Sequence, residues 1–262
     1  MIRLRMLGAF ALSIGIALFT AANVRAGSTI TIDPPSPTTT QLFSSSYYDV
    51  ATHYFPSASG YGGPGFSGGS GDELLRIVNP TARFGTLCGM IYVFDDIEEL
   101  QACCACPVTP NELVTLSVLN NLTSNFAVRG SNRMAGVVAL LSTIPQPILD
   151  KTQPLPPGAV ADPVLGIECD PACGALAGGA PCRAVDDGAA GASTLRATLS
   201  HPESMAPVSP PFQFISSTSI EEFQPDALDS NGTDVVPLIE GCGLIQANFS
   251  GAGICSCPNS GI

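Results

Sequence analysis

The distribution of apolar residues along the chain predicts strands separated by turns. Residues 86–94 form a continuous apolar run, which predicts a central strand buried on both faces. Eight further segments are strand candidates, at residues 28–32, 41–55, 74–78, 112–119, 134–144, 194–199, 212–216 and 243–249. Short helix starts or turns are expected at residues 219–223 and 229–240. Glycine- and proline-rich loops separate these segments, so the pattern predicts a mainly β fold, a β-sandwich.

One short helix is expected at residues 96–104, directly after the central strand. Asp95 can cap this helix, and Asp96, Glu98 and Glu99 fall in its first turn, where acidic side chains interact favourably with the helix dipole. The alternative is that these four acids form a calcium site or a catalytic carboxylate cluster.

The N-terminus has the pattern of a secretory signal peptide. Arg3 and Arg5 precede an apolar run over residues 6–22, and Ala26 is a small residue suited to the position before a cleavage site. Cleavage after Ala26 predicts a secreted or periplasmic protein that does not associate with a membrane once cleaved. The alternative is an uncleaved N-terminal anchor.

Removal of residues 1–26 from the 262 leaves 236 and takes the formal net charge from −12 to −15, because the signal contains three arginines and no acids. The length of this remaining segment, residues 27–262, suits one β-sandwich domain with a cysteine-stapled loop insertion around residues 145–193. So acidic a surface repels nucleic acid and anionic lipid, which we therefore do not expect as partners. The lack of tryptophan disfavours carbohydrate binding, although tyrosine can replace it as an aromatic platform.

Ten cysteines, an even number, follow the signal: Cys88, Cys103, Cys104, Cys106, Cys169, Cys173, Cys182, Cys242, Cys255 and Cys257. In an oxidising compartment they predict up to five structural disulfides. The loop that contains Cys169 holds three of them, so full pairing requires a bridge from this loop to the rest of the chain. Cys103 and Cys104 are expected to have different partners, with Cys242, Cys255 and Cys257 the natural candidates. The alternative is a thiolate site for zinc or copper(I).

Other candidate sites depend on few residues. The chain has two histidines, His53 and His201, and a hydrolytic triad requires one of them beside a serine and an acid. Asp226, Asp229, Asn231 and Asp234 offer oxygen ligands for calcium, the one cofactor that the sequence weakly suggests, although an Asn-Gly turn explains the same residues.

Two cysteine motifs carry a resemblance to a known family. The first runs from Leu87 through Asp95 to Cys103-Cys104-Ala105-Cys106, and the second ends the chain with Cys242 and Cys255-Ser256-Cys257. In these motifs, and loosely between residues 73 and 257, the chain resembles a family of uncharacterised, exported, cysteine-rich proteins of soil bacteria. The resemblance implies a bacterial origin, export and several disulfides, and assigns no catalytic residues.

Together these features predict an exported, non-enzymatic structural or recognition protein for an extracellular polymer or protein. Two alternatives stay open. One is an extracellular hydrolase with dispersed carboxylates around Asp95, Asp96, Glu98 and Glu99, and the other is the thiolate metal protein.

Overall fold

The computed structural model describes residues 31–33, 43–50, 72–80, 84–128, 134–148, 155–173, 183–185, 195–202, 206–208, 213–215, 218–226, 236–248 and 251–257. The expected signal peptide and its cleavage site, His53, Cys182 and three of the four candidate calcium ligands, Asp229, Asn231 and Asp234, lie outside these residues.

The larger sheet is organised around one long strand, β7 (Ala135–Ile144). On one side β7 pairs antiparallel with β4 (Leu87–Phe94), which pairs in turn with β5 (Leu100–Val108). On its other side β7 pairs with β2 (Phe43–Asp49) and beyond that with β16 (Gln224–Asp226). Two short strands extend the end of β7, namely β11 (Arg183–Val185) and β1 (Thr31–Asp33).

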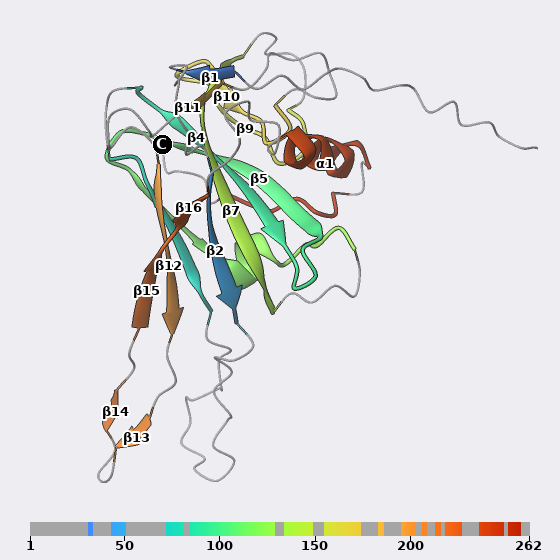
Figure 1. Cartoon of the computed structure of the whole chain (residues 1–262). Helices are drawn as coiled ribbons and strands as arrows, with labels where there is room; N and C mark the ends of the chain where they lie inside the picture. The colour runs from blue at the N-terminus through green and yellow to red at the C-terminus, as the bar shows by residue number, and fades with distance from the viewer. Residues whose placement is uncertain are drawn as a thin grey trace, which may run out of the picture.

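The smaller sheet faces the larger one and makes the fold a β-sandwich (Figure 1). Its strand order is β15 (Thr218–Glu222), β12 (Arg196–Pro202), β3 (Leu74–Val78) and β6 (Leu113–Ser117). The strand after β15 is β16, so one continuous segment pairs first with the smaller sheet and then with the larger. At the corner between them Phe223 is buried, and its backbone N–H donates to the Ala197 carbonyl at 3.0 Å.

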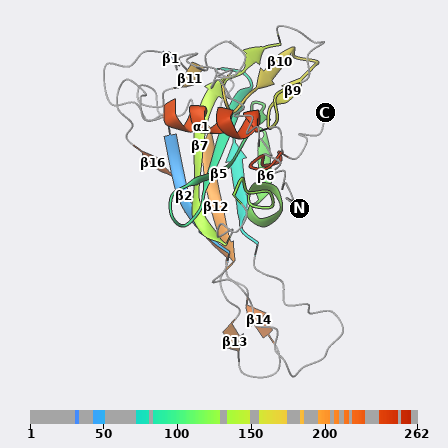
Figure 2. The ribbon, with the colours of Figure 1, turned by 90° about the vertical axis from the view of Figure 1, so that its right-hand side faces the viewer.

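A third layer covers part of the outer face of the larger sheet (Figure 2). It contains the helix α1 (Val236–Ala247) and a small sheet of β8 (Gln146–Pro147), β10 (Ile167–Cys169) and β9 (Val160–Asp162). The remaining elements are the hairpin of β13 (Ala206–Val208) and β14 (Gln213–Ile215) and the π-helical turn η1 (Val118–Leu122). Helix α1 is held by Gln246, whose Nε2 donates to the Pro157 carbonyl at 2.8 Å and to Asp170 Oδ1 at 2.9 Å.

Strand β4 is the centre of the structure, as its apolar sequence predicts. Successive side chains of a strand point to opposite faces. Ile91 and Val93 pack between the two sheets, and Met90 and Tyr92 pack beneath the third layer. Because apolar side chains on both faces are removed from water, both layers stabilise this strand. The prediction of a central strand buried on both faces is confirmed.

The prediction of a helix at residues 96–104 is wrong. Residues 100–108 form β5, which pairs with β4 over its whole length. Asp95, directly after β4, stabilises a turn rather than a helix start, because a carboxylate can accept hydrogen bonds from free backbone N–H groups in either structure. The prediction of a strand at residues 243–249 is also wrong, since residues 236–247 form α1. Residues 218–222 form the strand β15, where a short helix start or turn was expected at 219–223.

Candidate functional site

The four acids of the predicted carboxylate cluster lie on the turn between β4 and β5. Asp95 is buried, and its Oδ1 accepts hydrogen bonds from the backbone N–H groups of Ile97 at 3.2 Å and Glu99 at 2.9 Å. Its Oδ2 accepts from Gln101 Nε2 at 2.9 Å. Asp96, Glu98 and Glu99 are exposed on the same turn. These bonds give the Asp95 carboxylate a structural role in shaping the turn.

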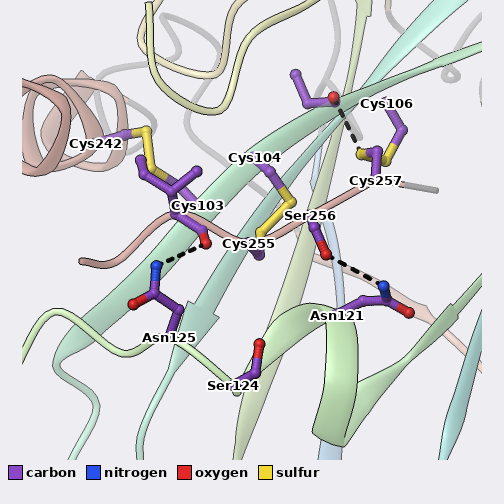
Figure 3. Close-up of a disulfide and its surroundings, with 12 residues drawn as sticks. Cys103, Cys104, Cys106, Asn121, Ser124, Asn125, Cys242, Cys255, Ser256 and Cys257 are labelled. Atoms are coloured by element: carbon purple, nitrogen blue, oxygen red, sulfur yellow. Dashed lines mark hydrogen bonds between the residues drawn. A yellow bond between two sulfur atoms is a disulfide. The ribbon is translucent and has the colours of Figure 1, made fainter. Parts of the chain in front are cut away.

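The cysteines form disulfides that attach later parts of the chain to β4 and β5, and Figure 3 shows those of β5. The pairs are Cys88–Cys169, Cys103–Cys242, Cys104–Cys255 and Cys106–Cys257. Cys173 is also disulfide-bonded, and the described part of the chain contains no free cysteine. A disulfide sulfur is not a thiolate, so the cluster at residues 103–106 does not present thiolate ligands in this structure.

The partners follow from the alternation of β5. Cys103 faces the third layer and is bonded to α1, whereas Cys104 and Cys106 face the core between the sheets and are bonded to residues 255 and 257. Two sequence predictions are thereby confirmed. Cys103 and Cys104 have different partners, and Cys88–Cys169 is the bridge from the three-cysteine loop to the rest of the chain.

The C-terminal segment 253–257, which we call the clip, also covers the edge of β5. The Cys103 N–H donates to the Gly253 carbonyl at 2.9 Å, and the Cys255 N–H donates to the Cys103 carbonyl at 3.3 Å. The clip is held on its other side by Asn121, whose Nδ2 donates to Ser256 Oγ at 3.2 Å (Figure 3). An exposed edge strand is a template for aggregation, and the clip protects β5 from it.

His201 lies at the end of the smaller sheet between two glutamates. Its Nδ1 is 2.8 Å from Oε1 of Glu73, a side chain with no exposed surface. Its Nε2 is 3.3 Å from Oε2 of Glu221, which lies on β15 and is about half exposed. Glu73 Oε1 also accepts a hydrogen bond from the Asp49 N–H at 3.2 Å, so this carboxylate connects the two sheets.

This arrangement differs from a hydrolytic triad at the group that faces Nε2. A buried acid on Nδ1 orients the imidazole as the acid of a hydrolytic triad does. The nitrogen that activates the nucleophile in a triad is Nε2, and here it faces the Glu221 carboxylate. The structure therefore brings His201 together with two acids, and the residue directly opposite it on β15 is Ser219.

A row of partly exposed apolar side chains crosses the outer face of the larger sheet. Tyr47 of β2 lies directly opposite Val137 of β7, which lies opposite Phe94 of β4, which lies opposite Leu100 of β5. Tyr47 is 52% exposed, and the other three are partly buried. We call these four residues the aromatic row. Phe94 and Leu100 pack against the core beneath α1, so the helix lies beside one end of the row.

The charges near the row are negative. Burial raises the pKa of the Tyr47 hydroxyl, and the carboxylates of Asp49 and Asp96 raise it further. Asp49 is two residues beyond Tyr47 on β2, and Asp96 is two residues beyond Phe94. The tyrosine therefore keeps its proton at neutral pH and presents a hydroxyl that can both donate and accept hydrogen bonds.

Sequence reasoning identified neither the aromatic row nor the contact of His201 with Glu73. The row combines residues from four strands, and only their register makes them neighbours. The available signal was the alternation of side chains along a strand, which places Tyr47 and Tyr48 on opposite faces. Ser44 and Ser46 share the face of Tyr48, and Ser45 and Asp49 share the face of Tyr47.

The comparisons identify no relative. No protein-family model, no curated protein and no solved structure matches the chain. In the part of the chain that the structure describes, no helix has both the length and the apolar character needed to cross a membrane.

Proposed function

We propose that the protein is an exported recognition protein that binds an extracellular polymer or protein through the aromatic row. The observation that carries the proposal is the in-register placement of Tyr47, half exposed, beside Val137 and Phe94 on a sheet face that the third layer covers only in part. Binding proteins favour such tyrosines, because the ring offers a large contact area with little side-chain entropy to lose.

The rigidity of the surface beneath the row supports this proposal. β2, β7, β4 and β5 form one continuous antiparallel sheet, and disulfides fix β4 and β5 to the third layer. A side chain on a preorganised strand loses less conformational freedom on binding than one on a loop, so more of the contact energy remains as affinity.

The disulfides and the charge indicate the setting. Disulfides form and persist in oxidising compartments, which agrees with the predicted signal peptide. After cleavage of the predicted signal peptide the formal net charge is −15, and such a protein is repelled by nucleic acids and anionic lipids. An uncharged polysaccharide or an extracellular protein is therefore the class of ligand that we propose.

The roles of the candidate catalytic groups also favour binding over catalysis. Asp95 shapes a turn through three hydrogen bonds, and His201 is held between Glu73 and Glu221. A general acid or base must be within reach of the substrate proton that it transfers, and Asp95 is instead buried and committed to the turn.

The test uses the exported protein, isolated with its disulfides intact. Its intact mass should correspond to a chain that begins at Gly27, with no cysteine alkylated before reduction. The protein is then incubated with a panel of immobilised polysaccharides and extracellular proteins, and both binding and product release are measured. We expect saturable binding to at least one ligand class without product. Catalytic turnover of a panel member, or no binding to any of them, would contradict the proposal.

A further inference from the structure

The contacts of His201 determine where its protons lie. A carboxylate can only accept hydrogen bonds, so the 2.8 Å contact between Nδ1 and Glu73 requires a proton on Nδ1. In the neutral imidazole the other nitrogen, Nε2, is then an acceptor with a lone pair in the ring plane. Glu73 is completely buried and also accepts from the Asp49 N–H, so this orientation of the ring is fixed.

The second contact brings two electron-rich atoms together. Nε2 lies 3.3 Å from Oε2 of Glu221, and in the neutral histidine both atoms present lone pairs. Two such atoms repel each other unless a positive charge lies between them. That charge is either a second proton on the imidazole or a metal ion bound by both atoms.

The separation of the two atoms suits a metal ion. Ligand atoms about 2.0–2.1 Å from a tetrahedral zinc ion lie about 3.3 Å from one another, and the observed separation is 3.3 Å. A histidine that binds a metal usually donates its other N–H to a carboxylate, which fixes the tautomer and raises the basicity of the ligand. Glu73 occupies this position relative to His201.

We infer that His201 Nε2 and the Glu221 carboxylate form a binding site for a divalent transition-metal ion of the zinc class, with Glu73 as the carboxylate that orients the imidazole. A mixed nitrogen and oxygen donor pair favours zinc over calcium and magnesium, which prefer oxygen ligands alone. Among the described residues no three histidine, cysteine, aspartate or glutamate side chains form a metal-binding group, so water completes the coordination.

The site connects three strands. Nε2 of His201 is itself buried, whereas the side chain of Glu221 beside it is 49% exposed, so an ion reaches Nε2 from the side of β15 by displacing the Glu221 carboxylate. Glu73 precedes β3, His201 is on β12, and Glu221 is on the edge strand β15. The bound ion would fasten β15, which continues into β16 of the larger sheet, to the centre of the smaller sheet.

The experiment is a calorimetric titration of the full exported protein, without an affinity tag and after chelator treatment, with zinc chloride near neutral pH. We expect one equivalent of zinc. Glu221→Gln and His201→Gln should each weaken binding at least tenfold, and Glu73→Gln should weaken it about 10–100-fold through the lost orientation of the ring. The matched control is Glu222→Gln, which removes the same charge from the neighbouring position of β15 and should change affinity less than about twofold.

Glu221 is half exposed, so its variant is expected to fold even if the buried Glu73 and His201 variants do not. Nitrogen NMR of His201 provides a second measurement, because zinc should shift Nε2 and leave Nδ1 protonated. Three results would overturn the inference. These are no stoichiometric binding, binding that Glu221→Gln leaves unchanged, and binding that is lost in His53→Gln instead.

Discussion

The hydroxyl of Tyr48 donates a hydrogen bond to the carbonyl oxygen of Phe94, 3.2 Å away, although the two residues lie on strands that are separated by β7. The bond is possible because the residue of β7 opposite Tyr48 is Gly136, which has no side chain. This contact connects β2 to β4 at the end of the sheet where Tyr47 and Phe94 form part of the aromatic row.

Substitution of Gly136 by alanine should be strongly destabilising. A Cβ atom at this position would overlap the Phe94 carbonyl oxygen and lie 2.8 Å from the Tyr48 hydroxyl, and backbone has little room to move. We expect a loss of at least about 2 kcal/mol in the free energy of unfolding, measured by denaturant titration. The control is Gly89→Ala, where the new atom would meet the ends of side chains rather than backbone, the nearest being those of Leu195 and Leu140 at 3.2 and 3.3 Å. Equal losses in the two variants would contradict this explanation.

The two disulfides of the clip should show strong non-additivity. Cys104–Cys255 and Cys106–Cys257 join the same two segments, so either one keeps the C-terminus in place when the other is removed. Cys103–Cys242 remains in all variants and already anchors residue 242 to β5. The additional loop that a clip disulfide closes therefore begins at residue 242 and contains on the order of 15 residues, which is worth about 3 kcal/mol in the chain-entropy model.

Each double alanine variant that removes one clip disulfide should therefore lose much less stability than the quadruple variant that removes both. Denaturant unfolding under oxidising conditions measures this difference. Additive losses would indicate that each disulfide acts through its own local packing rather than through the shared loop.

Residues 100–108 show which signals in the sequence were informative and which were not. Cysteine spacing indicated that Cys103 and Cys104 have different partners, because neighbouring side chains diverge in any regular structure. The same residues were predicted as a helix, because Asp95 and the acids after it satisfy the rules for a helix start. Those rules describe hydrogen bonds to free N–H groups, which a hairpin turn also contains. Pairing of β5 with β4 decided between the two, and pairing is a tertiary contact.

The candidate sites were harder to predict from the sequence than the fold. Glu73 and His201 are separated by 128 residues, and Tyr47 and Phe94 by nearly fifty. Which residues share a row depends on strand order and register, and a shift of one residue would move Tyr47 to the opposite face. The long apolar run of β4, by contrast, was correctly predicted because burial on both faces is visible in a single segment.

Stability near neutral pH should increase when Glu168 is replaced by glutamine. Burial and, after it, the Asp170 carboxylate raise the pKa of Glu168 in the folded protein. An acid with a raised pKa contributes stability below its unfolded pKa, and this contribution is lost as the pH rises through the folded pKa. Glu168→Gln should thus raise the melting temperature at pH 7 and leave it nearly unchanged at about pH 3. The exposed Glu240→Gln is the control, and an equal gain at both pH values would contradict the assignment.

Tyr92 should resist ionisation until the protein unfolds. The ring is completely buried under the third layer, its hydroxyl donates to the Pro171 carbonyl at 3.0 Å, and burial followed by the Asp170 charge raises its pKa. Because the pKa is raised, stability is lost only as the pH rises through the tyrosine range. In an alkaline titration that follows tyrosinate absorbance, the wild type and Tyr92→Phe should give the same signal as long as both are folded. After unfolding, Tyr92→Phe should show one ionised tyrosine fewer. Ionisation of Tyr92 while the near-ultraviolet circular dichroism stays native would contradict its burial.

The central claim is that the aromatic row binds the ligand, and it is tested most directly by the affinity of Tyr47→Ala for the ligand that the panel identifies. Removal of a half-exposed ring should leave the melting temperature nearly unchanged and weaken binding at least about tenfold. The control is Val164→Ala, which truncates a side chain 78% exposed on the β9–β10 hairpin and should bind like the wild type. Wild-type affinity in Tyr47→Ala, or an equal loss in Val164→Ala, would contradict the claim.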